Sequence, residues 1–304
     1  MIFQKRTVVR IVGMFTVVAC VHTTAAADNS PALASSNPVI ATDSRYGLFD
    51  GLDQRSAYTQ EFFPQPLLVD DTSLQKDLEL EFSSLHTQVN GQQTDIVATE
   101  VQKSFGLLTL NLSVPYERDA NAAAVSQGIG NISLGARYPL YQFVSANGFF
   151  DTTLGVGMET GIPASSAISI NADFDPKVFN DLKLGEHFSL QSVFGYSTFV
   201  GGGGNGGLQT FEYGFAFAYA ISHDEMPLPG TQQFIPMFEL VGKTGLNKDA
   251  AGQNSLLGSM GFRLDLEPIG DLQPSLGLGY VFPIDNGGYA EVHWGIVTSL
   301  TFEF

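Results

Sequence analysis

The chain has 304 residues, of which 44% are hydrophobic and only 15% are charged. A soluble protein usually has about a quarter charged residues. The low charge, together with the abundant glycine (33) and phenylalanine (24), suits strands that face lipid on one side. The net charge of −17 argues against nucleic-acid binding, which needs basic patches. Acidic loops or an acidic channel interior are both compatible with this charge.

Residues 1–27 have the pattern of a cleavable signal peptide. A short apolar run, Ile11–Val21, follows three basic residues, and Ala25–Ala27 supplies small residues for cleavage before Asp28. The run is too short for a membrane anchor. The segment ending at Cys20 also loosely resembles a lipidation site, but we favour ordinary cleavage at the alanines. The basic residues are Lys5, Arg6 and Arg10.

The rest of the chain has no cysteine, because Cys20 is the only one. We therefore expect neither disulfide bonds nor thiolate chemistry in the mature protein. No later segment approaches 18 consecutive apolar residues, so we expect no transmembrane helix. A membrane location then requires a closed barrel, because unpaired strand edges cannot face lipid.

Residues 28–75 differ in composition from residues 76–304. Alanine, serine, aspartate and proline dominate, and the sequence around Phe62–Pro66 interrupts any regular element. We predict a partly disordered periplasmic extension, or a plug in which the part around Tyr46–Tyr58 packs under or into a barrel. The barrel itself is predicted for residues 76–304.

From residue 76 onward, segments of roughly ten residues alternate apolar and small or polar positions, which indicates transmembrane β-strands. The clearest is Leu208–Ala220, where five aromatic residues share one face and Glu212, Gly214, Ala216 and Ala218 share the other. We predict about twelve antiparallel strands. The least regular is 174–184, where Pro176 and mixed charges suit an edge or a loop. The weaker strands are 77–87, 94–103, 174–184 and 234–244.

The connections support an up-and-down barrel with a periplasmic N-terminus, in which short turns alternate with longer outer loops. Short links occur near Ser104–Phe105, Gly185–Glu186 and Glu267–Asp271. Longer links occur at 117–129, 161–173 and the glycine-rich 199–207. The link 221–233 is long where a short turn is expected, and a miscounted strand would explain it.

The last strand is predicted to carry a signal for outer-membrane assembly. Trp294, Leu300, Phe302 and Phe304 alternate on one face, and Phe304 is the last residue. A final strand of this kind resembles the signal that the barrel assembly machinery reads. We therefore expect that machinery and outer-membrane lipid as partners, in the outer membrane of a Gram-negative bacterium.

Two segments resemble strands of a known family. Gly128–Tyr138, followed by Pro139-Leu140, and Pro236–Gly242 are similar to strands of outer-membrane proteins linked to meta-pathway phenol degradation. The resemblance spans about 76–304. It implies a barrel that takes up small apolar or aromatic compounds, and it carries over no catalytic residue.

The charged residues that alternation places inside the barrel allow two interpretations. They form either an inter-strand ion-pair network that keeps the barrel shut, which we favour, or a polar pore with an acidic bias. The residues are Glu79, Glu81, Glu100, Arg137, Glu159, Glu212, Glu239, Lys243, Arg263, Asp265, Glu291 and His293.

No pattern indicates catalysis, a cofactor or a metal. Gly242-Lys243-Thr244 lacks the first glycine of a phosphate loop, since position 237 is methionine. His223–Glu225 reads as a solvated turn, and Asp173–Asp175 lacks the glycine and the spaced ligands of a calcium loop, so we treat it as solvated too. The histidines are not spaced as a metal pair.

Three functions remain open. The first is a channel or transporter for small molecules, which the barrel pattern, the glycine-rich loop and the resemblance favour. The second is a closed structural or surface-interaction barrel that works through its loops. The third, an outer-membrane lipase or protease, needs a cluster of catalytic residues at the outer rim that the sequence does not supply. A soluble periplasmic β-sandwich is the competing fold.

Overall fold

The computed structural model of the protein describes residues 63–72, 78–145, 149–202 and 205–304. The predicted signal peptide, Cys20 and most of the 28–75 extension lie outside these residues.

Twelve long strands form the wall of the molecule. Each has 10 to 15 residues, long enough to cross a bilayer at a steep tilt. In chain order they are β1 (Leu78–Val89), β2 (Gln92–Phe105), β3 (Leu108–Ala120), β5 (Asn131–Val144), β6 (Phe150–Pro163), β7 (Ala172–Leu184), β8 (Phe188–Val200), β9 (Gln209–Tyr219), β11 (Thr231–Gly245), β12 (Asn254–Leu266), β13 (Gln273–Pro283) and β14 (Trp294–Glu303).

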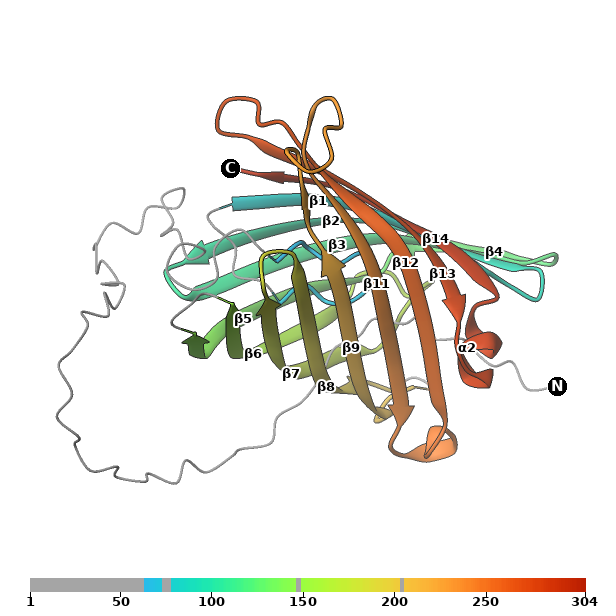
Figure 1. Ribbon diagram of the computed structural model, residues 1–304. Coiled ribbons are helices and arrows are strands. Elements are labelled where there is room, and N and C mark those ends of the chain that lie inside the picture. Colours follow the sequence, from blue (N-terminus) through green and yellow to red (C-terminus); the bar gives the residue numbers. More distant parts are fainter. Residues whose placement is uncertain (1–62, 73–77, 146–148, 203–204) are drawn as a thin grey trace, which may run out of the picture.

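The strands close into a barrel of antiparallel neighbours (Figure 1). Each strand pairs with the next along the chain, and β1 pairs with β14 from Glu79↔Glu303 to Gln88↔Trp294. This last pairing leaves the twelve-stranded ring without a free edge, as a membrane barrel requires. The predicted all-β antiparallel barrel of about twelve strands is confirmed.

Two short strands extend the wall at its ends. β4 (Val125–Ile129) pairs with the second half of β3, so that this hairpin projects beyond the ring (Figure 1). β10 (Ile221–Ser222) pairs with β11 inside the link 220–230. The strand count is therefore as predicted and the link 221–233 is long in its own right, so a miscounted strand is the wrong explanation.

The two faces of the wall have opposite character because successive side chains of a strand point to opposite sides. Outward positions carry exposed apolar residues, which match the lipid-facing band of a membrane barrel. Inward positions carry buried polar or small residues, such as Thr153, Ser189, Gln191 and Ser259. The outward residues include Leu110, Leu112, Leu134, Leu154, Met158, Phe211, Met260, Leu276, Leu278, Tyr280 and Ile296.

The segment 174–184 is neither an edge nor a loop, but forms β7 in the closed wall. Its pairing with β6 is continuous, from Phe150↔Leu184 to Gly161↔Asp173. Its pairing with β8 is interrupted between Phe174 and Lys177, where Pro176 has no amide hydrogen to donate. The proline thus disturbs the hydrogen bonds on one side only and leaves the strand in place.

The links divide between two ends, which we call the terminal end, where β1 begins and β14 ends, and the loop end opposite. One tight turn lies at the loop end, because Asn90 (φ 49°) and Gly91 (φ 76°) join β1 to β2. Asn-Gly is the preferred pair for a two-residue hairpin turn with positive φ at both positions. The Asn-Gly pair can be seen in the sequence, but the predicted topology expected longer loops at this end of the barrel and did not use it.

Two short helices lie at the loop end: η1 (Lys248–Ala250) and α2 (Asn286–Glu291). Within the described residues, no helix has the length and hydropathy needed to cross a membrane. Asp285 caps α2, and its carboxylate accepts hydrogen bonds from the amides of Gly288 (2.6 Å) and Leu256 (2.9 Å). It therefore ties the helix to β12.

Replacing Asp285 by alanine should loosen α2 by about 1 kcal/mol, the usual value of a helix cap. Partial burial raises the pKa of Asp285, but the amides of Gly288 and Leu256 and the Asn254 side chain hold it below the ordinary 3.8. The cap is then at full strength above pH 3.8 and is lost as the pH falls through the lower folded-state pKa. Hydrogen exchange of the α2 amides measures both effects, and equal exchange in the wild type and Asp285→Ala would exclude the cap.

Candidate functional site

The interior of the barrel collects most of the charges that alternation predicts there. Among the predicted residues, the almost fully buried ones are Glu79, Arg137, Glu212, Glu239 and Arg263. The half-buried ones are Glu81, Glu100, Glu159, Lys243 and Asp265. Several of them contact a segment that precedes β1, and the others bond to neighbouring wall residues. Arg263, for example, donates to Ser299 and Thr301.

Residues 63–72, which we call the strap, cross the inside of the barrel. The strap contacts β1 and β14 through Gln65, β11 through Leu67 and Leu68, and β5, β7 and β8 through residues 70–72. A ten-residue segment that bonds to strands on opposite sides of the ring can do so only from inside it.

The first part of the strap is fixed by amide side chains. Gln65 donates to Glu79 and Glu81, both at 3.0 Å, and accepts from Thr301 at 2.7 Å. Across the barrel, Gln191 of β8 donates to the carbonyl of Pro64. Because Gln65 is buried and uses both its amide nitrogen and its oxygen, this end of the strap has one defined orientation.

The middle of the strap is held through its backbone. The amides of Leu67 and Leu68 donate to the two carboxylate oxygens of Glu239, at 2.6 and 2.7 Å. The side chain of Leu67 packs against Gly277 and Gly279 of β13, and Val69 packs against Gly214 of β9. A Cβ atom added at Gly214 or Gly279 would lie 2.8 or 3.0 Å from these strap side chains, and one added at Gly277 would lie closer still, so a larger residue there would push the strap away.

The last part of the strap is acidic and meets two buried cations of the wall, Lys177 and Arg137. Asp70 lies 2.7 Å from the ammonium of Lys177, which also lies 3.5 Å from Glu159. Asp71 forms an ion pair with Arg137 at 3.2 Å. Thr72 donates to Asp181 and Gln191 of the wall. Buried charges are tolerated where they are paired in this way.

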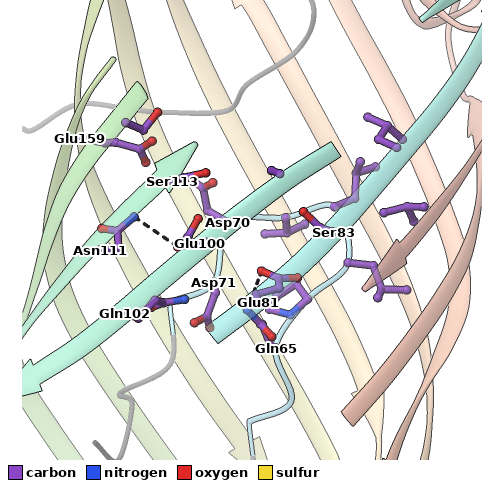
Figure 2. A pocket seen from close by; sticks show the side chains of 18 of the residues that line it. Gln65, Asp70, Asp71, Glu81, Ser83, Glu100, Gln102, Asn111, Ser113 and Glu159 are labelled. Atoms are coloured by element: carbon purple, nitrogen blue, oxygen red, sulfur yellow. Dashed lines mark hydrogen bonds between the residues drawn. The ribbon is translucent and has the colours of Figure 1, made fainter. Parts of the chain in front are cut away.

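Beside the strap lies a cavity of about 240 Å³. Figure 2 shows its acidic side, where Glu81, Glu100 and Glu159 point from the wall and Asp70 from the strap. Leu68, Leu85, Ile96 and Val297 line the apolar side. The lumen is therefore not completely filled by the strap.

The negative charge of this cavity is only partly balanced. Glu81 and Glu100 stand opposite each other in the register of β1 and β2. Within the described residues their hydrogen bonds come from amide side chains, Gln65 and Asn111, and neither forms an ion pair. Lys177 and Arg137 already bind the strap. An acidic lumen of this kind attracts cations and repels anions.

The structure corrects three expectations about polar residues. Asp175 is not solvated, because it lies buried on the inner face of β7. Glu291 and His293 are not on a strand but belong to α2 and the link that comes after it, where Glu291 pairs with Lys243 at 2.9 Å. Asp224 and Glu225 lie exposed in a turn, as expected.

The predicted assembly residues all lie at or near β14. Trp294 begins the strand and its ring contacts that of His86 on β1, and Phe302 makes an edge-on contact with Phe82. Leu300 is half-buried and Phe304 is exposed at the terminal end. Their role in assembly stays a prediction.

Sequence reasoning missed the residues of β7 and β8 that bind the strap: Lys177, Asp181 and Gln191. For Lys177 and Asp181 the signal is the alternation of Phe174, Val178 and Leu182 with charged residues, which Pro176 obscured. For Gln191 it is the alternation of β8, which places this residue opposite Leu190 and Phe194, although it was not selected as a site residue. Sequence reasoning also missed the strap itself, because the plug was placed around Tyr46–Tyr58, outside the described residues. Within the described residues, no group of three or more His, Cys, Asp or Glu side chains is arranged to hold a metal ion.

The sequence matches no family model and no curated protein. Among solved structures, the chain is similar to an outer membrane channel from Pseudomonas putida F1, with a TM-score of 0.54 and 16% identity over 78% of this chain and 100% of that one. The NanC porin (TM-score 0.44, 8% identity, 74% and 98% covered) and the KdgM porin (0.42, 12%, 74% and 99%) are more distant. At such identities the likeness shows a shared fold. The resemblance to the phenol-degradation family stays a prediction.

Proposed function

We propose that this protein is an outer-membrane channel for small molecules whose lumen is occupied by its own strap. The observation that carries the proposal is the strap itself, which crosses a twelve-stranded barrel and leaves a polar cavity beside it. Barrels of this size lie between filled eight-stranded barrels and open porins, so displacing one segment is enough to open a path. The apolar outer face and the barrel fold support an outer-membrane location.

Two features bear on the identity of the substrate. The family resemblance favours small apolar or aromatic compounds. The cavity has both an apolar side and an acidic side, which suits small solutes that are uncharged or positively charged. We propose no enzymatic activity, and we propose that the barrel assembly machinery recognises β14.

A closed structural barrel is the second candidate. The ion pairs of Asp70 and Asp71 favour it, because a strap held by buried charges also makes a stable plug. In that case the outer loops would carry the function.

Single-channel recording in planar bilayers, with and without residues 63–72, separates the two candidates. A channel should give discrete current steps that become larger when the strap is deleted, because the deletion removes the segment that crosses the lumen. Liposome swelling with neutral sugars checks that solutes pass as well as ions. If neither chain conducts or transports, the barrel is structural. The heat-dependent shift of folded barrels in gel electrophoresis confirms that both chains are assembled.

A further inference from the structure

Glu239 is a buried carboxylate on the inner face of β11, and both of its oxygens accept hydrogen bonds from the strap. It is 1% exposed. Its two oxygens accept hydrogen bonds from successive backbone amides of the strap rather than from side chains. No ion pair of the described residues involves it, so its charge is balanced chiefly by peptide dipoles and by the more distant Arg263.

The wall around Glu239 is built from small residues. Its register partners are Ala216 on β9 and Ser259 on β12, both 1% exposed. Neither side chain is long enough to compete with the carboxylate for the strap. The side chains beside Glu239 are therefore short, and a peptide backbone can approach the carboxylate.

The strap is shaped to meet this carboxylate. Residues 67–69 form a bend, and in this bend the amides of Leu67 and Leu68 converge on one side. Successive amides that converge in a turn form a concave anion-binding site. Here the anion is a side chain of the wall.

Apolar contacts on both sides of Glu239 set the position of the bend. Leu67 packs with the cluster that contains Met237, and Val69 belongs to the cluster that contains Val241. Met237, Glu239 and Val241 share the inner face of β11 because they are two residues apart. The carboxylate thus lies between two apolar contacts made by the same three strap residues.

We infer that Glu239, with the small wall residues around it, forms a binding site for a bent peptide backbone, and that strap residues 67–69 are its occupant. Glu239 is a positioning residue: it organises the bend and so places Asp70 and Asp71 opposite Lys177 and Arg137. The importance of this site for permeation rests on the proposed function, but the binding of the strap does not.

Hydrogen–deuterium exchange of the full chain tests the site directly. Glu239→Gln replaces one acceptor oxygen by an amino group that faces a backbone amide. We expect exchange at Leu67 and Leu68 to accelerate on the order of a hundredfold, because one of the two hydrogen bonds is lost and the other loses its charge assistance. Glu239→Asp keeps the charge on a shorter side chain and should give an intermediate rate. Exchange in the wall strands should stay the same.

Glu291→Gln is the matched control, since it removes the same charge from a residue bound to Lys243 and not to the strap. Unchanged exchange at Leu67 and Leu68 in Glu239→Gln, or equal acceleration in both variants, would overturn the inference. If Glu239→Gln does not assemble, Glu239→Asp decides: a wild-type rate overturns the site and a faster rate supports it. Recordings on the same variants report on permeation separately. If exchange accelerates but no chain gives current, the binding site is supported and the channel is rejected. If exchange is unchanged but the strap-deleted chain gives current, the channel is supported and the binding site is rejected.

Discussion

Replacing Lys177 by methionine should release the acidic end of the strap and destabilise the barrel by roughly 3–5 kcal/mol, the usual cost of removing one partner from a buried ion pair. Lys177 is almost fully buried and is the only cation within ion-pairing distance of Asp70 and Glu159 among the described residues. Its removal leaves two carboxylates near each other without their counter-charge. Methionine keeps most of the apolar stem, so the effect reports on charge rather than on packing.

The double variant Asp70→Asn, Lys177→Met separates the ion pair from other effects. With both charges removed, most of the stability lost in Lys177→Met should return, because residue 70 of the strap no longer carries a buried charge that lacks a partner. Reversible unfolding in urea from phospholipid vesicles gives the free energy of unfolding for each chain. If the loss of stability in the double variant equals the sum of the losses in Asp70→Asn and Lys177→Met, the ion pair does not hold the strap.

Replacing both Glu81 and Glu100 by glutamine should remove the preference for cations that we expect of the conducting state. The two carboxylates oppose each other on β1 and β2, line the cavity and form no ion pair among the described residues. At alkaline pH they give the wall beside the strap a negative potential, which concentrates cations and excludes anions. The reversal potential in a potassium chloride gradient at pH 9 measures this preference.

In that measurement the wild type should be cation-selective, and the double variant should move towards zero reversal potential. Glu225→Gln serves as a control, because it makes the same chemical change in an exposed turn at the terminal end. Anion selectivity in the wild type, or an equal change in the control, would show that these carboxylates do not set the selectivity.

The strap is the part of the structure that these expectations have in common. It is fixed at three places by different chemistry: amide side chains at Gln65, a backbone contact at Glu239 and ion pairs at Asp70 and Asp71. Each kind of contact responds differently to substitution, so the variants of Glu239 and Lys177 identify which contact contributes most to holding the strap. High salt should weaken these ion pairs less than it weakens exposed pairs, because they are largely shielded from solvent.

Much of the barrel could be predicted from the sequence alone. The alternation in segments such as Leu208–Ala220 identified the strands, their lipid-facing sides and their approximate number, because the period of a strand is two and a lipid-facing side must be apolar. The same rule identified most inward charges, including Glu239 and Arg137, which each contact the strap. The strand at 174–184 was also predicted, and only the expectation that Pro176 suits an edge or a loop was wrong, because β7 pairs with a neighbour on both sides.

Only the tertiary structure decided what those inward charges do. Their partners are not neighbours in sequence: Glu239 binds Leu67 and Leu68, more than 170 residues away along the chain, and Lys177 binds Asp70 over 107 residues. A strap of ten residues has no periodicity, because its side chains are placed by the wall around it and not by a repeating backbone. Alternation specifies which way a side chain points, but the position of a segment inside the barrel depends on the closed ring that surrounds it.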